Sequence, residues 1–454
     1  MTMKKTIMAL MAVGLSLTFQ SCLHDDTDLF DGKSPAERLE EAVTESKKLL
    51  ESADNGWMLH YYYGQDYSGG GFTYLCKFSD GKAEVSGDLF SPAYDVVSPT
   101  TVARSSYNVT EDQGPVLSFD TNNQVVHFLA QAYQDDIDGD QGDYEFIIMR
   151  TTQDSIYLKG KKWGNKVVMT RNASDFNWQS YLENIHKVVN SMSYFYNITR
   201  NGEKIGTATL DAQSRHAVVK VGNDSINRAF YMTENGIRFQ SEVKAGDVVL
   251  NSLQWNDADK SMTSADAPAV KFEGYVPDHY MTYGDWQTSF AGYGYLPTSS
   301  GDSKIQMKFD IASDLSSYRV TSSMEYSCKL SLSAKLSYDM YAYYDKTTGH
   351  VSFPIQRVID PTEQYPYLMV VPCATKNDGK GEYYEFNTSG CLDMMVTDDQ
   401  QNGVFTWNGA GSKSVPVNSL IFLACDSSGN LVTEDESAVP VLIIKNFENF
   451  EHLQ

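Results

Sequence analysis

Apolar and polar side chains alternate with a period of two along most of the chain, in short runs separated by turn residues. Such runs cover 57–63, 72–78 and 144–150, and Asp80-Gly81 is one of the turns between them. A period of two places successive side chains on opposite faces of a strand. The pattern therefore predicts many short antiparallel strands, in agreement with the 29 tyrosines and 21 phenylalanines, which strands favour.

Two segments follow the helical period instead. The first begins at Ser34, an N-cap residue type, with Pro35 at the first helical position and Glu37 completing a capping box. This helix is predicted to end before Gly56. The second predicted helix covers 175–192 and carries its apolar side chains on one side.

Each predicted helix precedes a group of strands, and this order divides the chain. We expect a helix plus β-meander domain at 34–172, a second helix plus β unit at 173–280 and an all-β domain at 281–454. The predicted fold class is mainly β, or β-rich α+β. N-terminal helix-plus-antiparallel-meander units are followed in it by an all-β sandwich or barrel domain.

Residues 1–21 have the pattern of an export signal. Two lysines are followed by an apolar stretch at 7–17 and then by Ser21, a small residue before Cys22. We expect cleavage by a lipoprotein-type signal peptidase and lipid attachment to Cys22, with ordinary cleavage nearby as the alternative. The apolar stretch is shorter than the roughly 20 residues of a membrane-spanning helix. The acidic, polar residues 22–33 predict a solvated tether.

The formal net charge is −23 at pH 7. Nucleic-acid binding relies on clustered Lys and Arg that neutralise phosphates, so this excess of acid argues against a nucleic-acid partner. The same excess favours solubility and repels anionic surfaces. We therefore expect the lipid, rather than the folded surface, to hold the chain at a membrane.

Six cysteines are present, and Cys22 leaves five, without the close spacing of a metal-binding pair. Buried free thiols are one interpretation of these residues. A disulfide between Cys373 and Cys391 is the alternative, since export allows oxidation.

Several short motifs carry a resemblance to a known family. They are 34–39 (SPAERL), 52–57 (SADNGW), 114–121 (GPVLSFDT), 142–146 (GDYEF), 158–162 (LKGKK) and, in the second unit, 235–239 (NGIRF). By these motifs the chain resembles an uncharacterised lipoprotein family of Bacteroidota, catalogued as domain of unknown function 4302.

The resemblance implies a location and leaves the chemistry open. Members of this family look like surface lipoproteins that accompany nutrient-import systems, each with an outer-membrane transporter and its lipoprotein lid. The resemblance thus implies lipid anchoring in the outer membrane at the cell surface, with the periplasmic face as the alternative. It also implies the transporter and lid as partners. No catalytic residues come with it.

The densest acidic stretch is 135–143, where Asp136, Asp138 and Asp140 stand at alternate positions. Carboxylates at this spacing on a turning loop can converge on Ca²⁺. Counted from Asp136, the twelfth position is Ile147 rather than the Glu of an EF-hand. A structural calcium loop of another kind is therefore one interpretation, and a solvated acidic hairpin tip is the other. We expect no other cofactor.

Aromatic side chains cluster twice. Exposed rings stack on the apolar faces of sugars and make broad contacts with peptides. The candidate binding residues are Trp57, Tyr61 and Tyr63 in the first cluster and Tyr283, Trp286, Tyr293 and Tyr295 in the second. Alternation along a strand predicts that about half of each cluster is core.

Motifs typical of enzymes are missing from the sequence. The eight histidines are scattered without a His-Glu-x-x-His run, and there is no Gly-x-Ser-x-Gly elbow or dinucleotide fingerprint. Together with the tether, the β-modules and the aromatic clusters, this favours a non-enzymatic protein that captures a glycan or peptide ligand for nutrient uptake, or an accessory component of the import system. A secreted glycan-active hydrolase is one alternative, because paired carboxylates meet only in space. A structural or adhesive surface module is the other.

Overall fold

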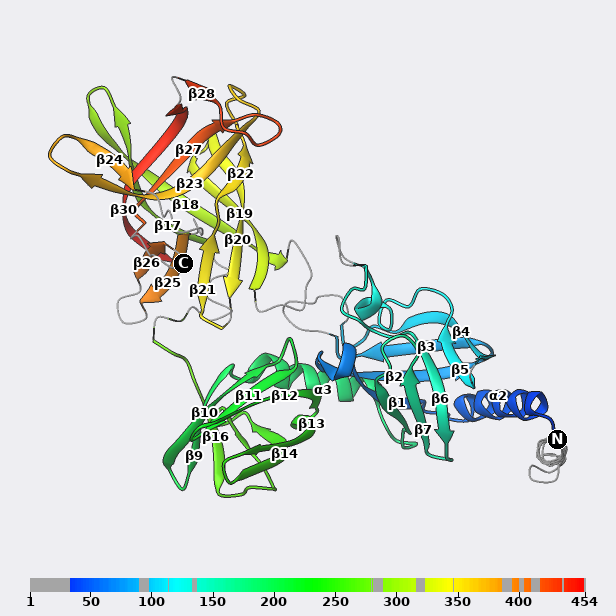
Figure 1. Ribbon diagram of the computed structural model, residues 1–454. Helices are drawn as coiled ribbons and strands as arrows, with labels where there is room; N and C mark the ends of the chain where they lie inside the picture. The colour runs from blue at the N-terminus through cyan, green and yellow to red at the C-terminus, as the bar shows by residue number, and fades with distance from the viewer. Residues whose placement is uncertain are drawn as a thin grey trace, which may run out of the picture. The chain divides into compact units, whose positions relative to one another are not determined.

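Figure 1 shows the computed structural model of the chain. The structure describes residues 33–89, 98–112, 114–132, 137–278, 280, 289–315, 323–345, 347–385, 394–399, 404–409, 417–434 and 437–452.

The first described helix begins as the capping pattern predicts. In α2 (Pro35–Glu51), the Ser34 hydroxyl accepts a hydrogen bond from the Glu37 N–H at 3.2 Å, and the Glu37 carboxylate accepts one from the Ser34 N–H at 2.8 Å. These bonds satisfy N–H groups that have no partner within the helix. The sequence therefore fixes the start of α2 locally.

Eight antiparallel strands after α2 form a closed barrel, in which each strand neighbours the next and β8 pairs with β1. Inward side chains such as Phe72 and Phe146 fill its interior. The elements are β1 (Trp57–Tyr62), η2 (Gln65–Tyr67), β2 (Gly71–Ser79), β3 (Lys82–Gly87), β4 (Ala103–Glu111), β5 (Pro115–Phe119), η3 (Phe128–Ala130), β6 (Glu145–Thr151), β7 (Ser155–Gly160) and β8 (Lys166–Arg171).

Helix α2 is attached to this first barrel by hydrogen bonds at its C-terminal turn. The Tyr107 hydroxyl of β4 donates to the Glu51 carboxylate at 2.6 Å. The buried indole N–H of Trp57 donates to the Leu50 carbonyl at 2.9 Å. The Leu50 carbonyl lies near the end of the helix and lacks an intrahelical partner, so this hydrogen bond satisfies it.

The second helix, α3 (Trp178–Ser191), begins three residues later than the predicted N-cap at 175. The Asn55 side-chain amide donates to the carbonyls of Ala173 at 2.8 Å and Phe176 at 2.6 Å. Because these carbonyls are bonded outside the helix, the segment before Trp178 forms a turn. The predicted helix itself is present.

A second closed barrel of eight antiparallel strands follows α3, with β16 pairing with β9. Its strands are β9 (Phe195–Arg200), β10 (Glu203–Asp211), β11 (His216–Val221), β12 (Asp224–Thr233), β13 (Gly236–Ala245), β14 (Val248–Asn256), β15 (Ser261–Thr263) and β16 (Val270–Tyr275). A helix followed by a closed barrel thus occurs twice. Each of the two predicted groups of strands closes into a barrel.

The remaining strands form one large antiparallel sheet, in the order β22-β23-β27-β30-β17-β18-β19-β20-β21-β25-β26, with β24 on β23 and a separate pair of β28 and β29. Their bounds are β17 (Ser289–Thr298), β18 (Gly301–Leu315), β19 (Ser323–Ser333), β20 (Leu336–Asp345), β21 (His350–Phe353), β22 (Gln356–Ile359), β23 (Tyr367–Asn377), β24 (Glu382–Glu385), β25 (Met394–Asp399), β26 (Val404–Gly409), β27 (Ser419–Cys425), β28 (Thr433–Glu434), β29 (Ser437–Ala438) and β30 (Pro440–His452).

This C-terminal sheet curls back on itself. The side-chain amide of Gln356 in β22 donates to the Tyr341 carbonyl of β20 at 3.0 Å and accepts from the Tyr341 N–H at 2.6 Å. The first strand of the sheet order therefore lies beside β20, which is far from it along that order. Together with the two barrels, this curled sheet confirms the predicted β-rich fold class.

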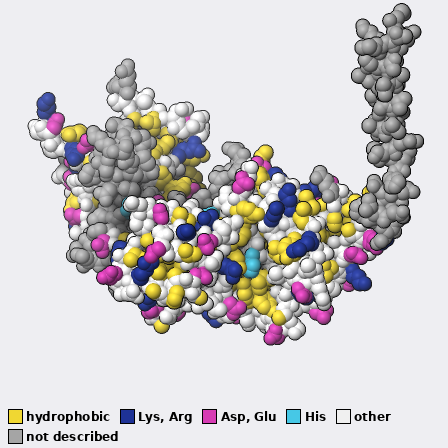
Figure 2. All heavy atoms as spheres, turned by 60° about the horizontal axis from the view of Figure 1, so that its bottom comes forward, with side chains coloured by type: hydrophobic (Ala, Val, Ile, Leu, Met, Phe, Trp, Pro, Cys, Tyr) yellow, Lys and Arg dark blue, Asp and Glu magenta, His cyan; other side chains and the backbone are white. Residues whose placement is uncertain are grey.

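The chain forms two compact units. The first contains α2 and most of the first barrel; the second contains the second barrel, the C-terminal sheet and the segments 67–72 and 87–100. The predicted domain boundaries stay predictions. No helix among the described residues is both long and apolar enough to cross a membrane. On the face shown in Figure 2, acidic and basic side chains are interspersed.

Candidate functional site

Two tyrosines of the second predicted cluster lie on the outer surface of the C-terminal sheet. In β17, Tyr293 and Tyr295 alternate with glycines, and a Cβ at Gly292 would lie 2.4 Å from the ring of Phe450, which is buried. Only glycine fits at such an inward position. The opposite side of the strand carries the rings outward, where Tyr293 is 37% exposed and Tyr295 is half-buried.

Strand β30 presents charged side chains to the same surface through two irregularities in its register. Tyr295 pairs with Lys445, Tyr293 with Glu448 and Ala291 with Glu451. Between successive pairs the chain therefore advances by two residues in β17 but by three in β30. Each of these three-residue intervals contains an asparagine with a left-handed backbone conformation: Asn446 and Asn449, both at φ 53°. Asparagine tolerates this conformation better than most residues, so each serves as the extra residue of a β-bulge.

Strands β17 and β30, with Lys304 of the neighbouring strand β18, bring together Tyr293, Tyr295, Lys304 and Glu448, which we call the Tyr293 face. The Lys304 ammonium lies 4.3 Å from the Tyr293 ring centroid and 2.5 Å from a Glu448 oxygen. The Tyr295 hydroxyl donates to the same carboxylate at 2.9 Å. The hydrogen bonds from Lys304 and Tyr295 hold the pKa of Glu448 below its usual value, and Glu448 raises the pKa of Lys304.

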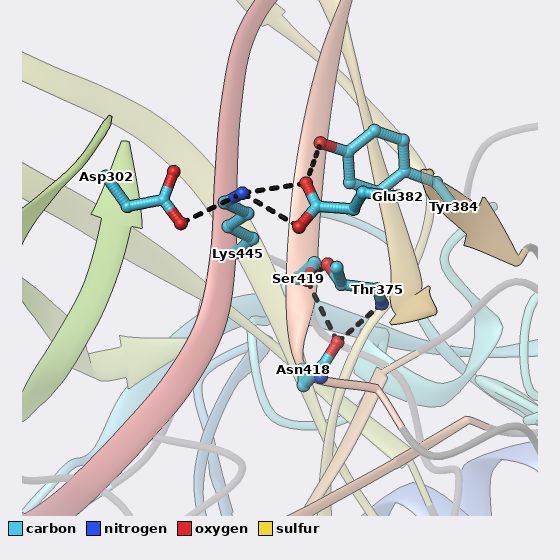
Figure 3. Close-up of polar contacts among 7 residues, drawn as sticks. All are labelled: Asp302, Thr375, Glu382, Tyr384, Asn418, Ser419 and Lys445. Carbon is cyan, nitrogen blue, oxygen red and sulfur yellow. Dashed lines mark hydrogen bonds and ion pairs between the residues drawn. The ribbon is translucent and has the colours of Figure 1, made fainter. Parts of the chain in front are cut away.

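Beside Tyr295, a second lysine joins two hairpins. Figure 3 shows Lys445 of β30 between Glu382 of β24 and Asp302 of β18, at 2.7 Å and 3.0 Å. The Lys445 side chain is 8% exposed. Burial lowers its pKa, but the hydrogen bonds to both carboxylates outweigh that effect and hold the pKa above the usual value. The Tyr384 hydroxyl also donates to Glu382, at 3.2 Å.

A neutral network anchors the strands beneath this lysine. The Asn418 side-chain oxygen accepts from the Thr375 N–H at 2.8 Å and from the Ser419 hydroxyl at 2.9 Å (Figure 3). The Asn418 carbonyl accepts from the Phe447 N–H at 2.8 Å. One asparagine thus joins β23, β27 and β30 close to Lys445.

Lys445→Met is expected to lower the free energy of unfolding by about 1–2 kcal/mol, because charge-assisted hydrogen bonds of a nearly buried group are lost. Chemical denaturation would measure this loss. Lys376→Met is the matched control: the Lys376 side chain is 43% exposed and 3.7 Å from Glu385, and such surface pairs contribute about 0–1 kcal/mol. Equal losses in both variants would contradict the role assigned to Lys445.

The first predicted aromatic cluster does not form an exposed surface. Trp57 and Tyr61 are 0% exposed and Tyr63 is 6% exposed. The interpretation of these rings as a ligand platform is therefore wrong. Tyr61 packs against the buried rings of Tyr74 and Phe146 in the first barrel, and the Trp57 indole bonds to the Leu50 carbonyl of α2.

The remaining predicted site residues are only partly described. Cys22, Asp136, Tyr283, Trp286 and Cys391 lie outside the described residues. The described thiols Cys76, Cys328, Cys373 and Cys425 are free and buried, and burial raises the pKa of the Cys373 thiol to about 12. With Cys373 free, the structure favours the interpretation of buried thiols over the alternative Cys373–Cys391 disulfide.

The acidic stretch is divided between a surface turn and the core. Asp138 accepts from the Lys162 ammonium at 2.7 Å, and Asp140 is half-buried in the same turn. Asp143, in contrast, is 2% exposed inside the first barrel. No group of three or more His, Cys, Asp or Glu side chains within the described part of the chain is arranged to hold a metal. Calcium binding at Asp136, Asp138 and Asp140 stays a prediction.

The sequence interpretation missed Lys304, Lys445 and Glu448. A signal was present, because 445–451 reads Lys-Asn-Phe-Glu-Asn-Phe-Glu, a three-residue repeat at the end of an apolar strand. A period of three is incompatible with a regular strand. Asparagine at each third position therefore indicates repeated β-bulges, which place Lys445 and Glu448 on the same face.

Residues 26–257, just over half of the chain, match the family described as a domain of unknown function (DUF4302). The chain belongs to the DUF4302 family. This confirms the resemblance seen in the short motifs. The matched region ends just after β14, so the C-terminal sheet of this DUF4302 protein, with the Tyr293 face, lies beyond it.

No curated protein matches the DUF4302 chain. Among solved structures, it is similar to the isotype 1 transferrin binding protein B from serogroup B Neisseria meningitidis, at 10% identity and a TM-score of 0.14. That similarity covers 84% of this chain and 66% of the other. A TM-score this low does not indicate a shared fold.

Proposed function

We propose that this DUF4302 protein is a non-enzymatic, lipid-anchored cell-surface protein that captures a neutral glycan on the Tyr293 face. In this proposal it presents the glycan to an outer-membrane transporter and its lipoprotein lid. The supporting observation is the exposed Tyr293 ring, held beside a hydrogen-bonded array of charged side chains on one rigid sheet.

The chemistry of the Tyr293 face suits a sugar better than an ion. A pyranose ring has an apolar C–H face that stacks on an aromatic ring, and tyrosine offers such a ring at a low cost in conformational entropy. The charges of Lys304 and Glu448 are paired with each other at 2.5 Å. They therefore offer hydrogen-bond donors and acceptors to sugar hydroxyls without a strong preference for an anion or a cation.

The anchor rests on the sequence pattern before Cys22. Lipidation of Cys22 would tether the folded units through the polar residues 23–33. Because the chain carries a net charge of −23, its own surface adds no attraction to anionic lipids. The lipid is then the main membrane attachment.

Capture by intact cells tests both parts of this proposal. Cells that express the full chain are expected to bind fluorescent oligosaccharides from a panel of neutral glycans. Tyr293→Ala should remain on the cells but bind at least tenfold more weakly, equivalent to about 1.4 kcal/mol. Cys22→Ala should be lost from the cell surface altogether.

Tyr144→Ala is the matched control, since Tyr144 is 41% exposed on the first barrel and should leave capture unchanged. Binding by Tyr293→Ala at the level of the unmodified protein would reject the Tyr293 face as the site. Surface retention of Cys22→Ala would reject the lipid anchor. A bound glycan that the protein shortens would favour the hydrolase alternative.

A further inference from the structure

A second tyrosine pair on the C-terminal sheet repeats the arrangement of the Tyr293 face. In β20, Tyr341 and Tyr343 stand two residues apart on the same side; Tyr341 is 48% exposed and Tyr343 is half-buried. The Tyr343 hydroxyl donates to Glu325 on the neighbouring strand β19. In both pairs, therefore, a glutamate of an adjacent strand holds one tyrosine while the other ring is exposed.

A groove lies beside Tyr341. It has a volume of about 480 Å³ and crosses β18, β19 and β20, with Asp310, Ser327, Lys329 and Asp339 among its lining residues. The strand register places Lys329 opposite both Asp310 and Asp339, and Ser327 opposite Tyr341. This volume is within the range of small-ligand sites. The lining combines hydroxyl, carboxylate and ammonium groups with one exposed ring.

The exposed ring is held on a fixed backbone. Both backbone groups of Tyr341 bond to the side-chain amide of Gln356, at 2.6 Å and 3.0 Å. A ring on a rigid strand loses little conformational freedom when a ligand stacks on it. Tyr341 is therefore preorganised for stacking at the edge of the groove.

We propose that the groove beside Tyr341 is a second subsite for the same neutral glycan, and that the ligand is a chain of several sugar units that engages both tyrosine pairs. This inference rests on the proposed function. Strands β17 to β20 are consecutive neighbours in one sheet, which separates the pairs by ~14 Å across the strands. Tyr293 pairs with Gln306 of β18, whereas Tyr341 lies level with the position after Ile311, so the pairs are also about six residues, or ~20 Å, apart along the strands. Their direct separation is therefore ~25 Å. An oligosaccharide covers such a distance, whereas a single sugar unit does not.

Two linked subsites give a polymer an advantage that its fragments lack. Once one subsite is occupied, the rest of the chain is held at high local concentration near the other, and avidity increases without new contacts. Loss of one subsite should therefore weaken the binding of long ligands much more than the binding of short ones at the remaining subsite.

Calorimetry on the chain without residues 1–22 tests the inference. The probes are cellohexaose, xylohexaose, mannohexaose and maltoheptaose, each with its disaccharide. For the glycan that binds, the unmodified protein is expected to bind two disaccharides per chain. Tyr293→Ala and Tyr341→Ala should each bind one disaccharide per chain, and the double variant should bind none. Tyr341→Ala should weaken binding of the long oligosaccharide at least tenfold, and Tyr383→Ala, which removes a 45% exposed ring of β24, should not.

The outcomes separate the two proposals. One disaccharide per chain with the unmodified protein, and binding unaffected by Tyr341→Ala, would overturn the second subsite and leave the Tyr293 face intact. No binding of any probe by the unmodified protein would overturn both proposals. If Tyr341→Ala fails to fold, as judged by circular dichroism, Asp339→Asn in the groove replaces it and should weaken binding of the long oligosaccharide in the same way.

Discussion

Arg215→Met is expected to lower the free energy of unfolding of the second unit by about 3–5 kcal/mol, because it removes one member of a buried ion pair. The side chains of Arg215 and Asp88 are both 0% exposed, and their nearest charged atoms are 3.6 Å apart. Methionine keeps much of the length of the side chain and its flexibility. The loss in the free energy of unfolding therefore measures mainly the cost of leaving the Asp88 carboxylate in the interior without this cation.

The surroundings of Arg215 explain why the residue is costly to replace. It lies in the β10–β11 turn with φ 57°, where the Asp211 carboxylate accepts from the N–H groups of Gln213 and Ser214. Its guanidinium also donates to the Asp88 carbonyl at 3.0 Å. One side chain thus fastens the turn to the segment 87–89, which belongs to the same compact unit.

A double-mutant cycle with Asp88→Asn gives the control. The asparagine side chain would be neutral, so the Arg215→Met/Asp88→Asn variant should be more stable than the sum of the two single losses implies. Chemical denaturation measures the cycle, and hydrogen exchange shows whether segments 67–72 and 211–216 are the ones that lose protection. A loss below about 1 kcal/mol for Arg215→Met, or strict additivity, would contradict the role of this pair.

Local sequence rules predicted the parts of the fold that depend on local interactions. The capping box at Ser34 and Glu37 forms as expected, and the period of two locates most strands. Closure of the barrels was not predictable, because the pairing of β1 with β8 joins residues that are distant in the sequence, such as Leu59 and Met169. Sequence periodicity contains no information about such a partner.

The two aromatic clusters show why half of the candidate site was misplaced. Trp57 and Tyr61 share one side of β1 and are buried, as is Tyr63 just after the strand, whereas Tyr293 and Tyr295 share the outward side of β17. Alternation identifies the two sides but does not say which one faces the core. In the second cluster, glycine identifies the inward side of the strand, because the Phe450 ring leaves no space for a side chain at Gly292.

Asp143→Ala is expected to destabilise the first barrel by about 1–3 kcal/mol, since it leaves two partly buried backbone N–H groups without their acceptor. One Asp143 oxygen accepts from the backbone N–H groups of Lys162 at 2.8 Å and Trp163 at 3.3 Å. The Asp143 N–H donates to the Tyr61 hydroxyl at 2.6 Å. Gly160 leaves room for the carboxylate, because a Cβ there would lie 2.0 Å from its other oxygen.

Asp143→Asn is the matched control, since its amide oxygen can accept the same two N–H groups without a charge. Burial raises the pKa of Asp143 above the usual 3.8, although the hydrogen bonds from Lys162 and Trp163 oppose this. A carboxyl whose pKa is raised on folding stabilises the fold at low pH, and this contribution is lost as the pH rises through the folded pKa. Relative to the unmodified protein, Asp143→Asn should therefore gain stability from pH 3.8 upward and then level off.

Denaturation of the three proteins over a pH series measures both effects. Asp143→Ala should be the least stable at neutral pH, and the difference between Asp143→Asn and the unmodified protein should change only within the acidic window. A pH-independent difference would mean that Asp143 does not change its protonation between the folded and unfolded states. Equal losses for alanine and asparagine would mean that the charge of Asp143, and not its acceptor oxygen, supports the turn at 161–165.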